Sequence, residues 1–191
     1  MPIHLNKTSI EDLILITPHV FEDHRGYFIK DFEKSLFENN GLPSVFYETN
    51  ESKSKKGTIR GLHFQQKFSQ GKLIRVIKGS VFDVAVDLRF DSPTFGKWEG
   101  FVLSETNHHE LFIPKGFAHG FLALEDDSIF NYKCTDKYSP EYDSGILFND
   151  KDINVEWPVE LVGGWGQVIT SEKDAKLQTF AEFVEKGISI E

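Results

Sequence analysis

The sequence predicts an all-β protein, a sandwich or barrel of short strands with a few short helices. Short apolar or alternating runs recur along the 191 residues, separated by turn signals such as Lys78-Gly79 and Asp91-Ser92-Pro93. This spacing is typical of sandwiches and barrels. The composition agrees, because 18 Phe and a single Met favour the aromatic and β-branched interior of a sheet protein over a helical bundle.

Seven apolar runs are predicted to form strands, and they cover residues 13–16, 73–77, 81–88, 100–103, 111–113, 120–124 and 129–133. The run 81–88 alternates most clearly, with Phe82 and Val84 on one face and Asp83 and Asp87 on the other. Two acids on one face could line a cavity, or they could be solvated or hydrogen-bonded.

Two short helices are expected. Residues 32–39 have helical spacing and end before Asn40-Gly41, which is a stop signal. Residues 171–184 contain another, with Ser171 as its cap and Asp174 in its first turn. No repeat or Pro/Ser-rich linker divides the chain, so we expect one domain over residues 1–191.

Charge and cysteine content exclude several classes of partner. A formal net charge of −9 argues against nucleic acid, whose backbone needs a clustered basic surface. The short basic run of residues 53–56 is a solvated loop or a phosphate contact. The single Cys134 cannot form an internal disulfide, which indicates a reducing compartment. No run is apolar enough to span a bilayer and no signal-peptide pattern is present, so we expect a cytoplasmic protein without a membrane partner.

One segment concentrates three chemically useful side chains. Residues 57–65 and 71–73 place Arg60, His63 and Lys72 within 13 residues, among glycines and strand-forming residues. A guanidinium binds phosphate, an imidazole moves a proton near neutral pH, and an ammonium stabilises an oxyanion. The combination indicates an enzyme that acts on a phosphorylated or nucleotide-linked substrate.

A second segment, residues 113–120, delivers His119 to the start of an apolar strand after a Pro–Gly turn. It resembles the second motif of the cupin jelly roll. In the first cupin motif, however, this chain has Gln65 in place of the second His and Lys72 in place of the Glu. Because a cation replaces a carboxylate ligand, we expect no metal cofactor.

The resemblance extends further, to the RmlC-like cupin family of dTDP-4-dehydrorhamnose 3,5-epimerases, isomerases of deoxysugar biosynthesis that need no cofactor. The shared motifs run along almost the whole chain: residues 23–26, 50–54, 58–65, 71–73, 81–89, 92–96, 113–121, 132–133, 148–150, 157–158 and 171–174. The resemblance implies a jelly-roll barrel and epimerisation of dTDP-4-dehydro-6-deoxy-D-glucose at C3 and C5, towards rhamnose and polysaccharides.

By resemblance, four side chains carry the reaction. His63 is the base and Asp174 is the acidic partner that orients its imidazole, since a carboxylate fixes the tautomer and raises basicity. Tyr132 is the acid that returns a proton across the sugar ring. Lys72 faces the C4 oxygen, where a cation stabilises the enolate more than the ketone.

The same resemblance supplies a binding set. Arg60 and Arg25 correspond to residues that hold the diphosphate, and the homodimer of the family implies that Arg25 acts across the subunit interface. The other substrate-contacting positions are Asn50, His119, Asp143 and Lys173. This chain departs from the family at Lys30 (usually Glu), at Glu48 (usually Gln) and at Lys137. In the family, positions 137 and 138 are commonly two adjacent aromatics, one of which stacks on the base, and here Lys137 precedes Tyr138.

Three alternatives remain open at this point. The chain could epimerise only C3 or only C5, or use another nucleotide-linked 4-keto-deoxysugar. It could instead be a non-catalytic cupin that binds a sugar nucleotide. A metal-dependent cupin enzyme is the third alternative, and metal analysis would identify it.

Overall fold

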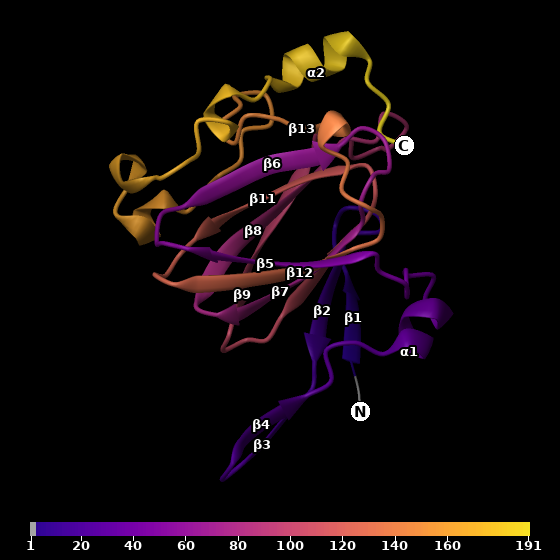
Figure 1. Ribbon diagram of the computed structural model, residues 1–191, viewed down its shortest axis with the longest axis vertical. Coiled ribbons are helices and arrows are strands. Elements are labelled where there is room, and N and C mark those ends of the chain that lie inside the picture. The colour runs from indigo at the N-terminus through magenta and orange to yellow at the C-terminus, as the bar shows by residue number, and fades with distance from the viewer. Residues whose placement is uncertain (1–2) are drawn as a thin grey trace.

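Two antiparallel β-sheets facing each other dominate the computed structural model, which describes residues 3–191 (Figure 1). The six-stranded sheet has the order β1 (Ile3–Lys7), β2 (Ile14–Pro18), β10 (Glu110–Ile113), β7 (Lys72–Lys78), β12 (Ser128–Cys134) and β5 (Glu48–Ser54). The five-stranded sheet has the order β13 (Asp143–Gly145), β6 (Ile59–Gln65), β11 (Phe117–Ala123), β8 (Ser80–Asp87) and β9 (Trp98–Ser104). The predicted all-β class is confirmed.

The inward-facing side chains of both sheets meet in one apolar layer. Residues of β7 and β8 that alternate in sequence, among them Val76 and Val81, belong to the same buried cluster. Phe121 of β11 and Phe130 of β12 stack with ring centroids 4.2 Å apart, so the two sheets are joined by an aromatic contact. Burial of this layer is the main source of stability for the sandwich.

The outer faces are covered by different segments. The segment after β13 lies over the five-stranded sheet and includes η2 (Val159–Val162), η3 (Trp165–Gln167), η4 (Asp174–Lys176) and α2 (Phe180–Lys186), whereas η1 (Pro140–Tyr142) comes directly before β13. On the six-stranded sheet, Phe37 of α1 (Lys34–Asn39) is buried with Leu73 and Phe112. Within residues 3–191 no helix is long and apolar enough to cross a membrane.

The predicted helices are partly confirmed. The first appears as α1, two residues shorter at its start than expected. The second was predicted as one helix, and this is wrong, because η4 and α2 are separated by residues 177–179. Ser171 does accept a hydrogen bond from the Asp174 backbone N–H at 3.0 Å, but α2 has its own capping box from Thr179 and Glu182.

All seven predicted strands are present, and further strands were not predicted as such. One pair, β3 (Val20–Asp23) and β4 (Gly26–Ile29), forms a separate two-stranded hairpin that projects away from both sheets (Figure 1). Tyr27 and Phe28 on this hairpin are exposed. The hairpin therefore contributes little to the core and presents an apolar surface.

One carboxyl group is buried on the outer side of the six-stranded sheet. Glu110 is 2% exposed and its Oε1 has no hydrogen-bond partner among residues 3–191. Burial raises the pKa of Glu110 to about 8, helped by the nearby Asp31 and opposed by Arg75 and Lys133. Asp31 and Arg75 form an ion pair of 2.7 Å beside it.

We predict that Glu110→Gln gains stability relative to the wild type as pH rises. A carboxyl group with a raised native-state pKa contributes its full stability below its unfolded-state pKa of about 4.3 and loses it as pH rises through about 8. The difference in free energy of unfolding should change by roughly 1–4 kcal/mol over that range. Urea unfolding at a series of pH values measures it, with exposed Glu160→Gln as control. Parallel curves for wild type and Glu110→Gln would contradict the prediction.

Candidate active site

A polar cavity of about 290 Å³ opens between the two sheets. The five-stranded sheet contributes His63 and His119, and the six-stranded sheet contributes Lys72 and Tyr132, so these pairs line opposite walls. The remaining lining residues are Ser52, Arg60, Phe64, Gln65, Gln70, Phe121, Phe130, Tyr138, Asp143 and Lys173. Most of the side chains predicted from the sequence therefore meet in one place.

A β-bulge in β6 aims Arg60 and His63 at the same cavity. Along β11, His119 is opposite His63 and Phe121 is opposite Arg60, so β6 has one residue more than β11 over this stretch. In a regular strand, residues three apart point to opposite faces. The bulge contains Gly61, whose φ of +107° suits glycine.

His63 and Asp174 form a hydrogen-bonded pair. The imidazole Nε2 lies 2.8 Å from Asp174 Oδ1, and Asp174 Oδ2 accepts the backbone N–H of Gly61 at 3.1 Å. Burial would raise the pKa of Asp174, but the hydrogen bonds from His63 and Gly61 outweigh it and the pKa lies below its usual range. The aspartate is therefore ionised near neutral pH, which makes Nε2 the protonated nitrogen and leaves Nδ1 basic.

A second His–Asp pair lies beside the first. His119 Nε2 is 2.9 Å from Oδ2 of Asp83, whose side chain is fully buried in β8. The other oxygen, Oδ1, has no hydrogen-bond partner among the described residues. The sequence left open whether Asp83 and Asp87 line a cavity, face solvent or form hydrogen bonds. Both are hydrogen-bonded, since Asp87 accepts a bond from Arg89 at 2.9 Å.

The opposite wall carries a cation and a phenol. Burial lowers the pKa of Lys72, while Cys134, Asp143 and Asp83 act in the other direction. Burial also raises the pKa of Tyr132, so the phenol is protonated near neutral pH. Base, acid and cation around one cavity suit removal of a proton next to a carbonyl group and its return from the other side.

The rim of the cavity is held by polar contacts among predicted residues. Tyr138 donates its hydroxyl to Asp143 Oδ2 at 3.1 Å and its backbone N–H to Glu48 Oε1 at 2.6 Å. Lys173 forms an ion pair with Asp143, and this hydrogen bond raises the pKa of Lys173. The four side chains at the rim come from three segments that are far apart in the sequence.

Four predicted binding residues do not line the cavity of this chain: Arg25, Lys30, Asn50 and Glu48. Arg25 lies in the β3–β4 hairpin and pairs with Asp23 at 2.6 Å. Lys30 pairs with Glu33 at 2.7 Å. Asn50 of β5 is paired with Tyr132 of β12, and its side-chain amide contacts Cys134 Sγ at 3.9 Å. From the basic run, Lys53 pairs with Asp127 at the surface.

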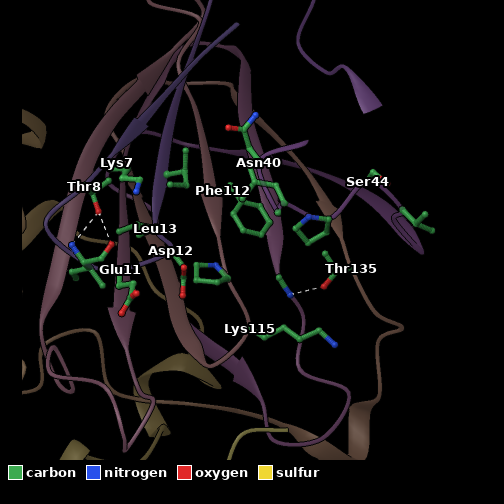
Figure 2. A pocket seen from close by; sticks show the side chains of 18 of the residues that line it. Lys7, Thr8, Glu11, Asp12, Leu13, Asn40, Ser44, Phe112, Lys115 and Thr135 are labelled. Atoms are coloured by element: carbon green, nitrogen blue, oxygen red, sulfur yellow. Dashed lines mark hydrogen bonds between the residues drawn. The ribbon is translucent and has the colours of Figure 1, made fainter. Parts of the chain in front are cut away.

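A larger cavity, of about 860 Å³, lies elsewhere and contains none of the predicted side chains. Figure 2 shows it between residues 7–14, residues 40–47 and the end of β10, with Phe112 and Lys115 among its lining residues. It is lined by no histidine. Across residues 3–191 no three His, Cys, Asp or Glu side chains are grouped as a metal ion would require.

Several side chains of the site were not singled out as functional by sequence reasoning. The alternation of β8 placed Asp83 on one face of the strand, but it did not show whether that face lines a cavity or is solvated or hydrogen-bonded. Gln65 was considered only as a replaced metal ligand, and Gln70 had no signal at all. Both glutamines bind backbone atoms of the distant segment 136–139, and no motif spacing reveals such contacts.

Comparison with known proteins gives consistent results. A family model described as dTDP-4-dehydrorhamnose 3,5-epimerase matches residues 7–182. The dTDP-4-dehydrorhamnose 3,5-epimerase of Methanothermobacter thermautotrophicus is 53% identical over 176 residues, which are 92% of this chain and 94% of that protein.

Solved structures are similar over nearly the full length. The dTDP-6-deoxy-D-glucose-3,5-epimerase RmlC of Legionella pneumophila, in complex with dTDP-4-keto-L-rhamnose, has a TM-score of 0.92 and 40% identity and covers 100% of this chain and 99% of its own. ChmJ, a 3'-monoepimerase of Streptomyces bikiniensis in complex with dTDP-quinovose, has a TM-score of 0.86 and 28% identity, with coverages of 95% and 90%.

We predict that Gly61→Ala disrupts the bulge. A Cβ at this position would lie 2.5 Å from the carbonyl oxygen of His119 and 2.7 Å from Cα of Gly120, at a φ that L-residues rarely adopt. The free energy of unfolding should fall by about 1–3 kcal/mol or more. Gly166→Ala is the control, because its Cβ would meet nothing within 4 Å. Equal stability of the two variants in urea unfolding would contradict the prediction.

Proposed function

The chain belongs to the dTDP-4-dehydrorhamnose 3,5-epimerase family, and from that premise we propose how its cavity performs the reaction. The predicted cupin jelly roll, the isomerase class and the dTDP-sugar substrate are confirmed. The observation that carries the mechanism is the pairing of His63 with Asp174 on one wall, opposite Tyr132 on the other.

The first step is removal of a proton beside the 4-keto group. The ketone acidifies the hydrogens at C3 and C5, and Nδ1 of His63 takes one of them while the C–H electron pair moves into the enolate. Asp174 holds the imidazole by Nε2 at 2.8 Å and stabilises the imidazolium that forms.

The second step returns a proton from the opposite side. Tyr132 donates its hydroxyl proton to the same carbon, which forms a new C–H bond with inverted configuration and restores the ketone. The tyrosinate then recovers a proton from solvent and the imidazolium loses one. Support for this role comes from the position of β12 in the sheet facing β6, and from burial that keeps the phenol protonated.

Lys72 stabilises the intermediate between the two steps. Its ammonium group lies on the wall with Tyr132, where it meets the negative charge that develops on the C4 oxygen. Asp83 and Asp143 nearby act against the burial that lowers its pKa, and so favour the charged form. A cation placed in this way binds the enolate more strongly than the ketone.

The remaining predicted residues bind the nucleotide diphosphate and the sugar. Arg60 faces the diphosphate from the wall that bears His63, while His119, Asp143 and Lys173 contact the sugar end and Tyr138 the base. Glu48, Asn50 and Lys30 act near the nucleotide. We further propose a homodimer in which Arg25 of a second copy completes the phosphate site, supported by the exposed apolar hairpin that carries it. The single cysteine supports a cytoplasmic location.

Deuterium incorporation from solvent shows directly which of the two carbons, C3 and C5, exchanges its proton. Incubation with dTDP-4-dehydro-6-deoxy-D-glucose in heavy water is expected to place deuterium at C3 and C5, read by NMR of the sugar. His63→Ala should abolish incorporation at both carbons, because no other group in the mechanism removes the proton. Incorporation at one carbon would identify a monoepimerase, as in ChmJ. Incorporation at neither would contradict the proposal.

Lys72→Met tests the enolate role. The variant keeps the length of the side chain but removes its charge, so kcat should fall by about 10²–10³-fold, the typical cost of one lost oxyanion donor. Affinity for dTDP, measured by calorimetry, should stay within about threefold because the nucleotide lies at the other end of the cavity. Lys176→Met, an exposed lysine, is the matched control. A Lys72→Met variant with unchanged kcat would exclude the role.

A further inference from the structure

The side-chain amide of Gln65 has no assigned role in the mechanism, yet it is one of the most connected groups beside the cavity. Gln65 ends β6, two residues after His63, and is 5% exposed. Its Nε2 donates to the carbonyl oxygens of Phe68 at 2.7 Å and Lys137 at 3.0 Å, and its Oε1 accepts the backbone N–H of Ser139 at 2.8 Å. The amide therefore uses both donors and one acceptor on backbone atoms.

Two of these bonds flank Tyr138. The carbonyl of Lys137 precedes this residue and the N–H of Ser139 follows it, so Gln65 holds the backbone on both sides. The backbone N–H of Tyr138 itself is bound by Glu48. With three consecutive residues fixed, the backbone leaves the tyrosine ring little freedom other than rotation of its own side chain.

Tyr138 needs this support because its side chain has little other packing. The residue is 51% exposed, and its one side-chain hydrogen bond runs to Asp143. Asp143 lies opposite Gln65 in the β13–β6 pairing and is also bound by Lys173. Thus one strand, β6, carries both the base His63 and the group that fixes the distant rim.

We propose that Gln65 is a positioning residue, which preorganises Tyr138 at the cavity rim for the nucleotide end of the substrate. The proposal rests on the proposed function. Without the amide, the Lys137–Ser139 segment loses two backbone contacts and Tyr138 samples positions away from the cavity. Substrate binding must then order that segment, which weakens the affinity for the substrate, whereas the rate of proton transfer at His63 does not change.

The first experiment is a double-mutant cycle on KM and kcat. Gln65→Leu is expected to raise KM for the dTDP-sugar at least about tenfold with kcat within about threefold. Tyr138→Ala should raise KM as well. In the Tyr138→Ala background, Gln65→Leu should have no further effect, because its action passes through that ring. An unchanged KM for Gln65→Leu, or the same KM ratio in both backgrounds, overturns the proposal.

A second variant guards against misfolding of Gln65→Leu. Gln65→Glu keeps the shape and the bond to Ser139, but as a carboxylate it faces two carbonyl oxygens and repels them. When protonated, the same group again donates one hydrogen bond. The ratio of its KM to that of the wild type should therefore fall as pH is lowered towards 5. A ratio that is constant or rises with falling pH overturns the proposal.

The control and the readouts separate the possible failures. Gln178→Leu removes a half-buried glutamine whose Nε2 binds Ser144 outside the cavity, and it should leave KM within about twofold. The affinity for dTDP, measured by calorimetry for each variant, follows the nucleotide end without any turnover. If the wild type binds dTDP but does not turn over the sugar, the proposed function fails. If it turns over and the Gln65 variants match it in KM and affinity, only the inference fails.

Discussion

The buried carboxylate of Asp174 is the contact on which the arrangement of the site depends. One of its oxygens binds the imidazole of His63 and the other binds the backbone N–H of Gly61. A single side chain from the C-terminal segment thus orients the base and holds the bulge that aims it. Its ionisation is favoured by the same two hydrogen bonds, against the cost of burial. Catalytic geometry and local backbone geometry are stabilised together, by a residue more than a hundred positions away.

Each strand that the sequence predicted has a face in the core. The run of β8 alternates because Val81 packs between the sheets while Val84 packs on the outer layer. Strand β5 has no apolar residue, because at its position the inner face meets the polar cavity rather than the core. The β3–β4 hairpin was missed for a related reason, since it covers no core. Residues 171–184 were taken as one helix because cap and periodicity signals of two short elements run on without a break.

For the site, too, the sequence predicted the residues that stand in local motifs and missed those whose role depends on tertiary contacts. His63, Lys72 and His119 stand in motifs whose spacing is itself informative, and family resemblance added Tyr132 and Asp174. The positions of Arg25 and Lys30 away from the cavity follow from the projecting hairpin, whose course is not encoded in the motif. Gln65 was read only as a missing ligand. Its role depends on which backbone atoms the distant segment 137–139 presents to it, and that is a property of the folded chain.

The bulge in β6 also bears on how such sites are recognised in other sequences. One extra residue divides the strand into two parts whose side chains alternate out of phase. The guanidinium in the first part and the imidazole in the second share a face although three positions separate them, a spacing that strict alternation forbids. A search that assumes regular pleating would assign one of the two to the wrong side of the sheet. An Arg-Gly-x-His sequence inside an expected strand therefore favours a bulge at the glycine, which places the arginine and histidine side chains on the same face.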